Sequence, residues 1–146
     1  MGRLQDLDVS RLLFWLSRRQ CDYGGFNGRT NKLLDSCYSF WVGAIFKIVD
    51  NYFNKKISID GRMLYSEFEL QRYVLSYCQD ERGGLWDKPG KKRDLYHTCY
   101  AMCGLSLSQE VEMVNKENET SDIDPIYNVE KDVLKEAEEF FSKIEK

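Results

Sequence analysis

The chain contains an internal repeat, and this repeat limits the possible folds more than any other feature of the sequence. Two glycine pairs, Gly24-Gly25 and Gly83-Gly84, lie 59 residues apart, and segments 11–48 and 70–107 align around them. The same offset relates five further identical pairs: Leu16 and Leu75, Ser17 and Ser76, Gln20 and Gln79, Lys32 and Lys91, Asp35 and Asp94. Repeats of this size usually mark stacked supersecondary units. The sequence therefore predicts two copies of one folding unit.

Each unit is expected to contain a helix, a glycine loop, a charged loop and a second helix. Residues 11–20 and 70–79 have the apolar rhythm of amphipathic helices. The second helices begin near Asp35 and Asp94, and aspartate is a common helix N-cap. Their sequences, CYSFWVGAIFKIV and YHTCYAMCGLSL, are rich in aromatic and small residues and predict helices buried nearly all round.

The remaining segments connect or follow these units. Residues 50–61 are predicted to form a polar loop, and residues 110–124 a polar linker. The C-terminal segment, 125–146, contains the pattern of an amphipathic helix over 129–144. We therefore expect an all-α chain of helical hairpins, with the repeats occupying residues 8–109.

Bulk properties exclude several classes of protein. The 146 residues suffice for one domain, and no long uncharged apolar run predicts a transmembrane segment. Five cysteines form an odd count without an apolar leader, which favours a reduced, cytoplasmic chain. Residues 1–109 are net basic and residues 110–146 are net acidic. A basic body can bind phosphate-rich ligands, but we expect no nucleic-acid partner.

Three residue types that bind zinc lie at equivalent points of the two units. His97 is the single histidine, and the 59-residue offset places it opposite Tyr38, directly after Cys37. Helix starts of stacked hairpins share one rim, so His97 could meet Asp35 and Cys37. Three such ligands leave a fourth zinc position open, as in catalytic sites. In the alternative reading, Cys37 and His97 are hydrogen-bonded core residues.

Basic and aromatic residues surround these three positions. Arg29 and Lys32 precede the first buried helix, and a second group precedes the other helix: Lys88, Lys91, Lys92 and Arg93. Such side chains suit phosphate, particularly near helix N-termini, although they could equally be solvated loop charges. Aromatic residues follow in both helices, where they line either a ligand site or the core: Tyr38, Trp41, Tyr96 and Tyr100.

Two long motifs resemble those of the β subunits of protein prenyltransferases. They are GGFNGRTNKLLDSCYSFW (24–41) and GGLWDKPGKKRDLYHTCY (83–100), the second in its farnesyl-specific form. The resemblance covers about residues 8–109, and DPIYNV (124–129) is similar to the family's C-terminal stretch. It implies an α–α barrel, or toroid, of which this chain would form an incomplete ring, because chains of this family are considerably longer.

The resemblance also implies chemistry. Asp35, Cys37 and His97 would be the zinc ligands, and the open position would take the thiolate of a substrate protein's C-terminal CaaX cysteine. That thiolate would attack C1 of farnesyl diphosphate and release diphosphate. The remaining roles carried by the resemblance are diphosphate binding (Arg29, Lys32, Tyr38 and, more weakly, Lys91), magnesium binding (Asp87), the isoprenoid channel (Trp41), peptide contact (Tyr96) and a shortened lipid pocket (Tyr100).

Partners and alternatives follow from the same resemblance. The expected partners are a farnesyltransferase α subunit, farnesyl diphosphate and CaaX-terminated proteins, and the chain by itself is expected to be inactive. One alternative is a geranylgeranyltransferase β chain, with the same chemistry on a longer lipid. The other is a truncated, non-catalytic helical module that only binds a partner.

Overall fold

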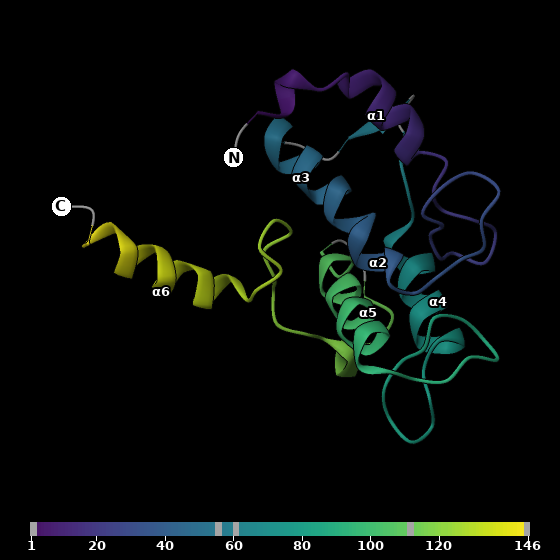
Figure 1. Ribbon diagram of the computed structural model, residues 1–146. Helices are drawn as coiled ribbons and strands as arrows, with labels where there is room; N and C mark the ends of the chain where they lie inside the picture. Colours follow the sequence, from purple (N-terminus) through teal and green to yellow (C-terminus); the bar gives the residue numbers. More distant parts are fainter. Residues whose placement is uncertain (1–2, 55–56, 60–61, 111–112, 145–146) are drawn as a thin grey trace.

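The protein is almost entirely helical, and its helices are arranged as stacked hairpins. The computed structural model describes residues 3–54, 57–59, 62–110 and 113–144. In chain order, the described elements are η1 (Leu4–Asp6), α1 (Val9–Leu16), α2 (Tyr38–Trp41), α3 (Gly43–Phe53), β1 (Ser58–Ile59), β2 (Arg62–Met63), α4 (Glu67–Tyr77), α5 (Leu95–Leu107), η2 (Lys116–Asn118) and α6 (Lys131–Ser142). α2 and α4 lie beside α5 in the body of the molecule (Figure 1). The predicted all-α class is confirmed, with one short antiparallel β-hairpin added.

Side-chain caps explain where three of the helices begin. The carboxylate of Asp8 accepts a hydrogen bond from a backbone N–H of α1, and Ser66 caps α4 in the same way. Asp94 caps α5, as predicted, by accepting from the His97 N–H at 2.8 Å. Asp35 instead accepts from the Cys37 N–H at 2.9 Å, and α2 begins only at Tyr38. Each oxygen satisfies a backbone donor that would otherwise lack a partner at a helix start.

The first buried helix differs from the prediction in two ways. It is divided at Val42 into α2 and α3, although Val42 keeps helical backbone angles. It also continues to Phe53, so the predicted polar loop over 50–61 is wrong for its first residues. Asn54 ends the helix because it adopts a left-handed conformation, with φ of 51°. The hairpin of β1 and β2 follows, while 55–56 and 60–61 lie outside the described residues.

The backbone hydrogen bonds repeat at the offset found in the sequence. Gln20 forms an isolated β-bridge with Phe26, and 59 residues later Gln79 forms the same bridge with Leu85. Further N–H groups donate to equivalent carbonyls in both units: Gly24 and Gly83, Asn27 and Trp86, Lys32 and Lys91, Asp35 and Asp94. The two glycine loops therefore share one hydrogen-bonding pattern, although Gly84 has a positive φ of 86° and its counterpart Gly25 does not. Each loop leads the chain to the start of a buried helix.

The two units are joined by close packing between α2 and α5. Gly104 lies directly against Ser39, where a Cβ atom on the glycine would come within 2.1 Å of the serine Oγ. The neighbouring Ser36 reaches across to the second loop, with its Oγ donating to the Trp86 carbonyl at 2.7 Å. Its N–H donates to the carbonyl of Asp87 at 2.8 Å. These contacts fix the register in which the two helix starts meet.

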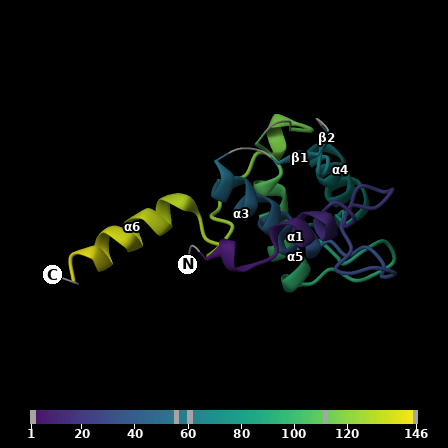
Figure 2. The same ribbon diagram turned by 90° about the horizontal axis from the view of Figure 1, so that it is seen from above.

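Three predicted segments have a different environment from the one expected. α5 is not buried nearly all round, because Leu95 is 89% exposed and Met102 is 44% exposed. The segment predicted as a polar linker places Ile123 in a hydrophobic cluster with Phe40 and Leu107. The predicted C-terminal amphipathic helix exists as α6, but none of its residues is buried, and it extends away from the body in both views (Figures 1 and 2).

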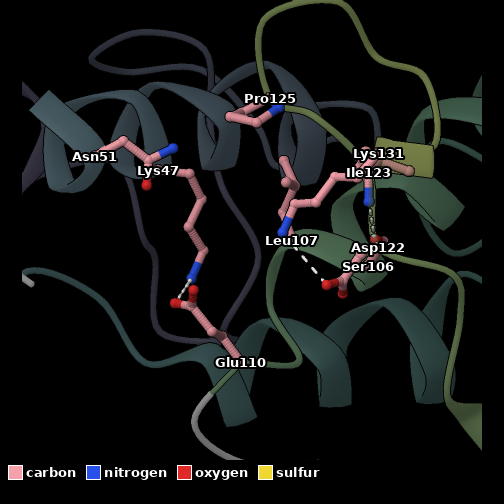
Figure 3. A pocket seen from close by; sticks show the side chains of 9 residues that line it. All are labelled: Lys47, Asn51, Ser106, Leu107, Glu110, Asp122, Ile123, Pro125 and Lys131. Carbon is pink, nitrogen blue, oxygen red and sulfur yellow. Dashed lines mark hydrogen bonds and ion pairs between the residues drawn. The ribbon is translucent and has the colours of Figure 1, made fainter. Parts of the chain in front are cut away.

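A small polar cavity lies between α3 and the segment that follows α5. Its lining carries the charges of Lys47, Glu110, Asp122 and Lys131 (Figure 3). The Lys47 ammonium lies 2.7 Å from Glu67 and 2.8 Å from Glu110. The volume of about 80 Å³ is well below the ~300–1,000 Å³ of typical small-molecule sites. Of these charged side chains, Lys47 and its partner Glu67 are buried, whereas Glu110, Asp122 and Lys131 are largely exposed. The cavity is therefore too small and too occupied by ion pairs to be the candidate functional site.

Two further observations concern the cysteines and the helices. All five cysteines are free thiols: Cys21, Cys37, Cys78, Cys99 and Cys103. Among the helices in the described part of the chain, none combines the length and the apolar composition needed to cross a bilayer.

Candidate metal centre

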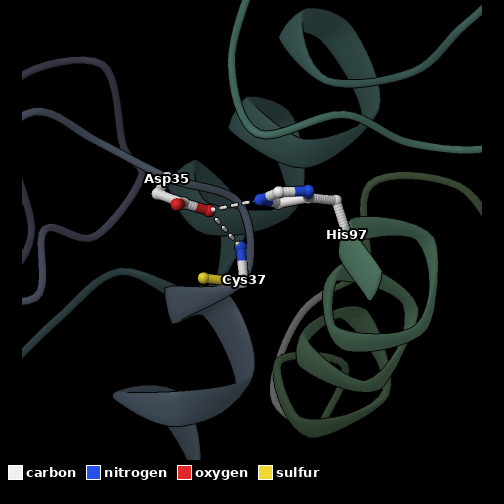
Figure 4. Close-up of side chains that lie close together, drawn as sticks. All are labelled: Asp35, Cys37 and His97. Carbon is white, nitrogen blue, oxygen red and sulfur yellow. Dashed lines mark hydrogen bonds and ion pairs between the residues drawn. The ribbon is translucent and has the colours of Figure 1, made fainter. Parts of the chain in front are cut away.

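Asp35, Cys37 and His97 come together in one cluster. Each offers one potential ligand atom, and these atoms all lie within 4.8 Å of one another. The His97 Nε2 atom is 3.3 Å from the Asp35 carboxylate, and the Cys37 sulfur lies near the same carboxylate (Figure 4). Two residues come from the chain before α2 and the third from the first turn of α5. The juxtaposition expected from the repeat is therefore present.

The turn before α2 explains how an Asp-x-Cys pair can converge. Residues two apart point away from each other within a helix. Here the chain is still turning, because the Asp35 carboxylate accepts the Cys37 N–H and the Asp35 carbonyl accepts the Tyr38 N–H at 3.0 Å. Both side chains therefore face the start of α5, which the packing of Gly104 on Ser39 holds beside them.

Asp94 orients the imidazole of His97, a role that the sequence analysis did not assign. Its second carboxylate oxygen lies 2.6 Å from His97 Nδ1, while its first oxygen caps the helix. The hydrogen bond from the His97 N–H and the contact with the imidazole both lower the pKa of Asp94. A carboxylate at Nδ1 favours the tautomer with its proton there and leaves Nε2 free as a ligand. The i to i+3 spacing of Asp94 and His97 was the available signal.

The Cys37 thiol is held protonated by its surroundings. Burial, followed by the hydrogen bond and charge of Asp35, raises the pKa of Cys37 to about 12. The hydroxyl of Tyr96 contacts the thiol and lowers this pKa, whereas the charge of Asp87 raises it further. A divalent cation would reverse this balance because a coordinated thiol loses its proton. One sulfur, one imidazole nitrogen and one carboxylate form a donor set that fits zinc, with a fourth position open.

Three aromatic side chains, with their rings tilted against one another, form a wall beside His97. Trp41 and Tyr100 have ring centroids 4.6 Å apart, and Tyr96 and Tyr100 are 4.8 Å apart. The indole N–H of Trp41 donates to the Tyr96 hydroxyl at 3.1 Å. Trp41 and Tyr96 remain 44% and 49% exposed, so the wall has an open apolar surface next to the cluster.

The other predicted binding residues lie on the two loops that lead to the cluster, except Tyr38, which is the first residue of α2. Arg29, Lys32 and Lys91 are exposed. Tyr38 is half-buried and lies against Gly28, where a Cβ atom would come within 2.3 Å of the tyrosine hydroxyl. Asp87 pairs with Lys88 through one carboxylate oxygen. Its other carboxylate oxygen is buried and meets no hydrogen-bond donor among the described residues, which suits a cation ligand.

Replacing Asp94 by serine should separate helix capping from imidazole orientation. Serine caps helices about as well as aspartate, but its short side chain cannot also reach His97 Nδ1. We expect zinc affinity to fall by about 10–100-fold, the usual effect of losing an outer partner of a ligand, with little change in the free energy of unfolding. Zinc titration and urea unfolding measure the two effects. Asp94→Ala is the comparison: because it also removes the helix cap, it should in addition lower the free energy of unfolding by about 1 kcal/mol. Unchanged zinc affinity in Asp94→Ser would contradict the orienting role.

Comparison with known proteins places this chain in a family. Residues 1–129 match the family model of the prenyltransferase alpha-alpha toroid domain. A protein farnesyltransferase subunit beta of Schizosaccharomyces pombe is 44% identical over 108 residues, which cover 73% of this chain and 28% of that protein. A geranylgeranyl transferase type-1 subunit beta of Arabidopsis thaliana is 40% identical over 104 residues, covering 71% of this chain and 25% of that protein.

A solved structure shows the same architecture. Candida albicans protein geranylgeranyltransferase-I complexed with GGPP matches with a TM-score of 0.70 and 27% sequence identity, over 91% of this chain and 38% of that chain. The present chain therefore spans 25% to 38% of the length of these three proteins. With its repeated helical hairpins and its match over residues 1–129, the chain belongs to the prenyltransferase α–α toroid family, and the two sequence relatives above are β subunits of protein prenyltransferases.

Proposed function

We propose that this chain is the β-subunit portion of a protein farnesyltransferase. The reaction transfers a farnesyl group from farnesyl diphosphate to the cysteine thiol of a C-terminal CaaX motif. The observation that carries this proposal is the convergence of Asp35, Cys37 and His97 within 4.8 Å, in a chain related to farnesyltransferase β subunits. The cluster supplies a zinc donor set with an open position where a substrate thiol can bind.

The ligand set and its surroundings suit activation of a thiol. Asp35, Cys37 and His97 would hold the ion, with His97 oriented by Asp94. Bound zinc lowers the pKa of a coordinating thiol, so that the nucleophile is a thiolate near neutral pH. The exposed wall of Trp41 and Tyr96 offers an apolar surface beside this point for the lipid and for the aliphatic residues of the peptide.

The basic loops would bind the diphosphate. Arg29 and Lys32 are exposed on the loop that precedes α2, and Lys91 is exposed on the equivalent loop of the second unit. Negative charge grows on the departing diphosphate in the transition state, so cations and the Tyr38 hydroxyl would favour the reaction as well as binding. The buried carboxylate oxygen of Asp87 could hold a magnesium ion together with phosphate oxygens.

The second candidate is geranylgeranyl transfer by the same chemistry. It is favoured by the Arabidopsis relative and by the solved Candida albicans protein, whose names specify that lipid. We favour farnesyl because the bulky Tyr100 packs against Trp41, where it would shorten a lipid pocket. The motif over 83–100, which includes Asp87, also has the farnesyl-specific form. The whole enzyme would also require an α subunit as its partner and would work in the cytoplasm.

A competition assay decides between the two lipids. This chain should replace the matching segment of the Schizosaccharomyces pombe β subunit, and the chimaera should be produced with the α subunit of that enzyme. Offered equal concentrations of farnesyl and geranylgeranyl diphosphate and a CaaX peptide, it should transfer mainly farnesyl in a zinc-dependent reaction. Preference for the longer lipid would support the second candidate, and a zinc-loaded complex without transferase activity would reject both.

A further inference from the structure

Arg19 is a buried cation at the start of the first glycine loop. It follows the C-terminal end of α1, and only 2% of its surface is exposed. Its Nε atom donates to the Trp15 carbonyl at 3.1 Å, and its guanidinium carbon lies 4.8 Å from the centre of a Trp15 ring. Its contacts among the described residues are with neutral groups, and its Nη1 atom is buried without a hydrogen-bond acceptor there.

A buried charge with only neutral neighbours is costly to the folded state. The cost of removing a guanidinium from water is normally offset by a facing carboxylate. The Trp15 carbonyl, in the last turn of α1, and the indole face offset part of this cost. Neither contact requires a permanent charge, because a neutral amide can donate to the same carbonyl. Polar features that lower stability are expected mainly at functional sites.

The guanidinium of Arg19 lies under the turn that carries Arg29 and Lys32. Its Nη2 atom donates to the Oγ1 atom of Thr30, an exposed residue of that turn, at 3.4 Å. The Lys32 N–H donates to the Arg29 carbonyl at 3.3 Å and closes the turn. The Arg19 carbonyl accepts the Asn27 N–H at 3.0 Å, which ties the loop to the end of α1. One buried and two exposed cations therefore meet at a single turn.

The second unit lacks this buried charge. By the 59-residue offset, the position equivalent to Arg19 is Cys78, whose Sγ donates to the Asp87 carbonyl at 3.8 Å. Asp87 itself corresponds to Gly28, so a carboxylate adjoins the second turn, whereas residues 23–34 contain no acidic residue. The first turn is therefore the more favourable of the two for an anion.

We propose that Arg19 is a positioning residue of an anion site on the Arg29–Lys32 turn. Its guanidinium supports the turn through Thr30 and adds a positive charge that strengthens the binding of diphosphate. A charge shielded from water interacts more strongly with a nearby anion, and is screened less by salt, than an exposed one. The proposal rests on the diphosphate role proposed above for Arg29 and Lys32, and it requires neither zinc nor transferase activity.

Calorimetric titration of the full chain with pyrophosphate tests the role of this charge. Arg19→Gln removes the charge but keeps a donor for the Trp15 carbonyl, and we expect it to bind pyrophosphate about tenfold more weakly than the unchanged chain. Arg19→Lys keeps the charge and should bind within about threefold of the unchanged chain, although lysine lacks the guanidinium fork. Recovery of affinity by lysine separates a role of charge from one of packing.

The neighbouring Arg18 provides a matched control. It is exposed, with its guanidinium carbon 4.0 Å from the centre of the Phe14 ring. The titrations are made at ionic strengths of about 0.01 M and about 0.1 M, where the Debye length is about 30 Å and about 10 Å. Any loss of affinity in Arg18→Gln should shrink at the higher ionic strength, whereas the loss in Arg19→Gln should remain. Urea unfolding shows whether each variant is folded.

Two results would overturn the role of Arg19: unchanged pyrophosphate affinity in Arg19→Gln, or an equal loss in Arg19→Gln and Arg19→Lys. Thr30→Val removes the contact with Arg19 from the exposed side of the turn, where folding is not at risk. We expect it to weaken binding as well, and if Arg19→Gln does not fold, unchanged affinity in Thr30→Val rejects the proposal.

Arg29→Ala distinguishes failure of this proposal from failure of the proposed function. If Arg29→Ala loses pyrophosphate binding and Arg19→Gln does not, the turn keeps its diphosphate role without Arg19. If the unchanged chain binds no pyrophosphate, the diphosphate role of the turn and the role of Arg19 are both rejected.

Discussion

A chain carrying Cys37→Ala is expected to bind zinc more than about 100-fold more weakly than the unchanged chain. Loss of an outer partner of a zinc ligand already costs about 10–100-fold, and this substitution removes one of the proposed ligands itself. Only Asp35 and His97 would remain, one fewer than the three protein ligands of catalytic zinc sites. Competition with a chromophoric chelator measures the affinity, and cobalt substitution shows whether a sulfur ligand is present.

The pH dependence of zinc affinity provides a second test of Cys37 as a ligand. Burial and Asp35 raise the pKa of Cys37 to about 12, so the thiol carries its proton throughout the neutral range. Zinc must displace that proton, and the affinity of the unchanged chain should therefore rise with pH.

Cys21→Ala is the control for Cys37→Ala, because Cys21 lies outside the cluster. Full zinc occupancy in Cys37→Ala, at the same affinity as in this control, would overturn the ligand assignment.

Gly104→Ala is expected to destabilise the fold by about 3 kcal/mol, the upper end of the usual cost of overpacking. A methyl group at this position would lie 2.1 Å from the Ser39 Oγ and 2.6 Å from the Ser39 carbonyl carbon, so the backbones of α2 and α5 must separate. The same displacement moves His97 away from Asp35 and Cys37. The free energy of unfolding from urea titration and the zinc affinity should therefore both fall.

Gly43→Ala is a matched control for this prediction. Gly43 is also a buried helical glycine, but an added Cβ atom would meet its nearest neighbour, Phe26, at an ordinary 3.9 Å. Alanine favours helix over glycine by up to about 1 kcal/mol, so this variant should be as stable as the unchanged chain or more stable. Equal stability of the Gly104→Ala and Gly43→Ala variants would show that the contact with Ser39 does not limit the packing.

The sequence by itself determined the repeat and, through it, the architecture. The 59-residue offset recurs in the β-bridges and loop hydrogen bonds of both units. Local signals were sufficient for Asp94 as a helix cap and for the helices around residues 70–79 and 129–144. These features depend on backbone capping and on residue spacing, both of which are set by a few neighbouring residues.

The sequence also indicated the metal cluster, but only as one of two readings. Their equivalent positions in the two repeats predicted that Asp35, Cys37 and His97 lie on the same rim. Their distances depend on how α2 packs on α5, and the close approach of Gly104 to Ser39 sets that packing. The second hydrogen bond of Asp94, to His97 Nδ1, depends likewise on a side-chain conformation that spacing does not specify.

Only the tertiary structure decided which apolar surfaces are covered. The sequence predicted α5 to be buried nearly all round, yet Leu95 and Met102 are exposed, while Ile123 from the expected polar linker is buried. Composition records how much apolar surface a helix carries, whereas burial depends on which distant segments lie against it. Capping, turns and repeat spacing are local and could be read from the sequence; coverage by non-local neighbours could not.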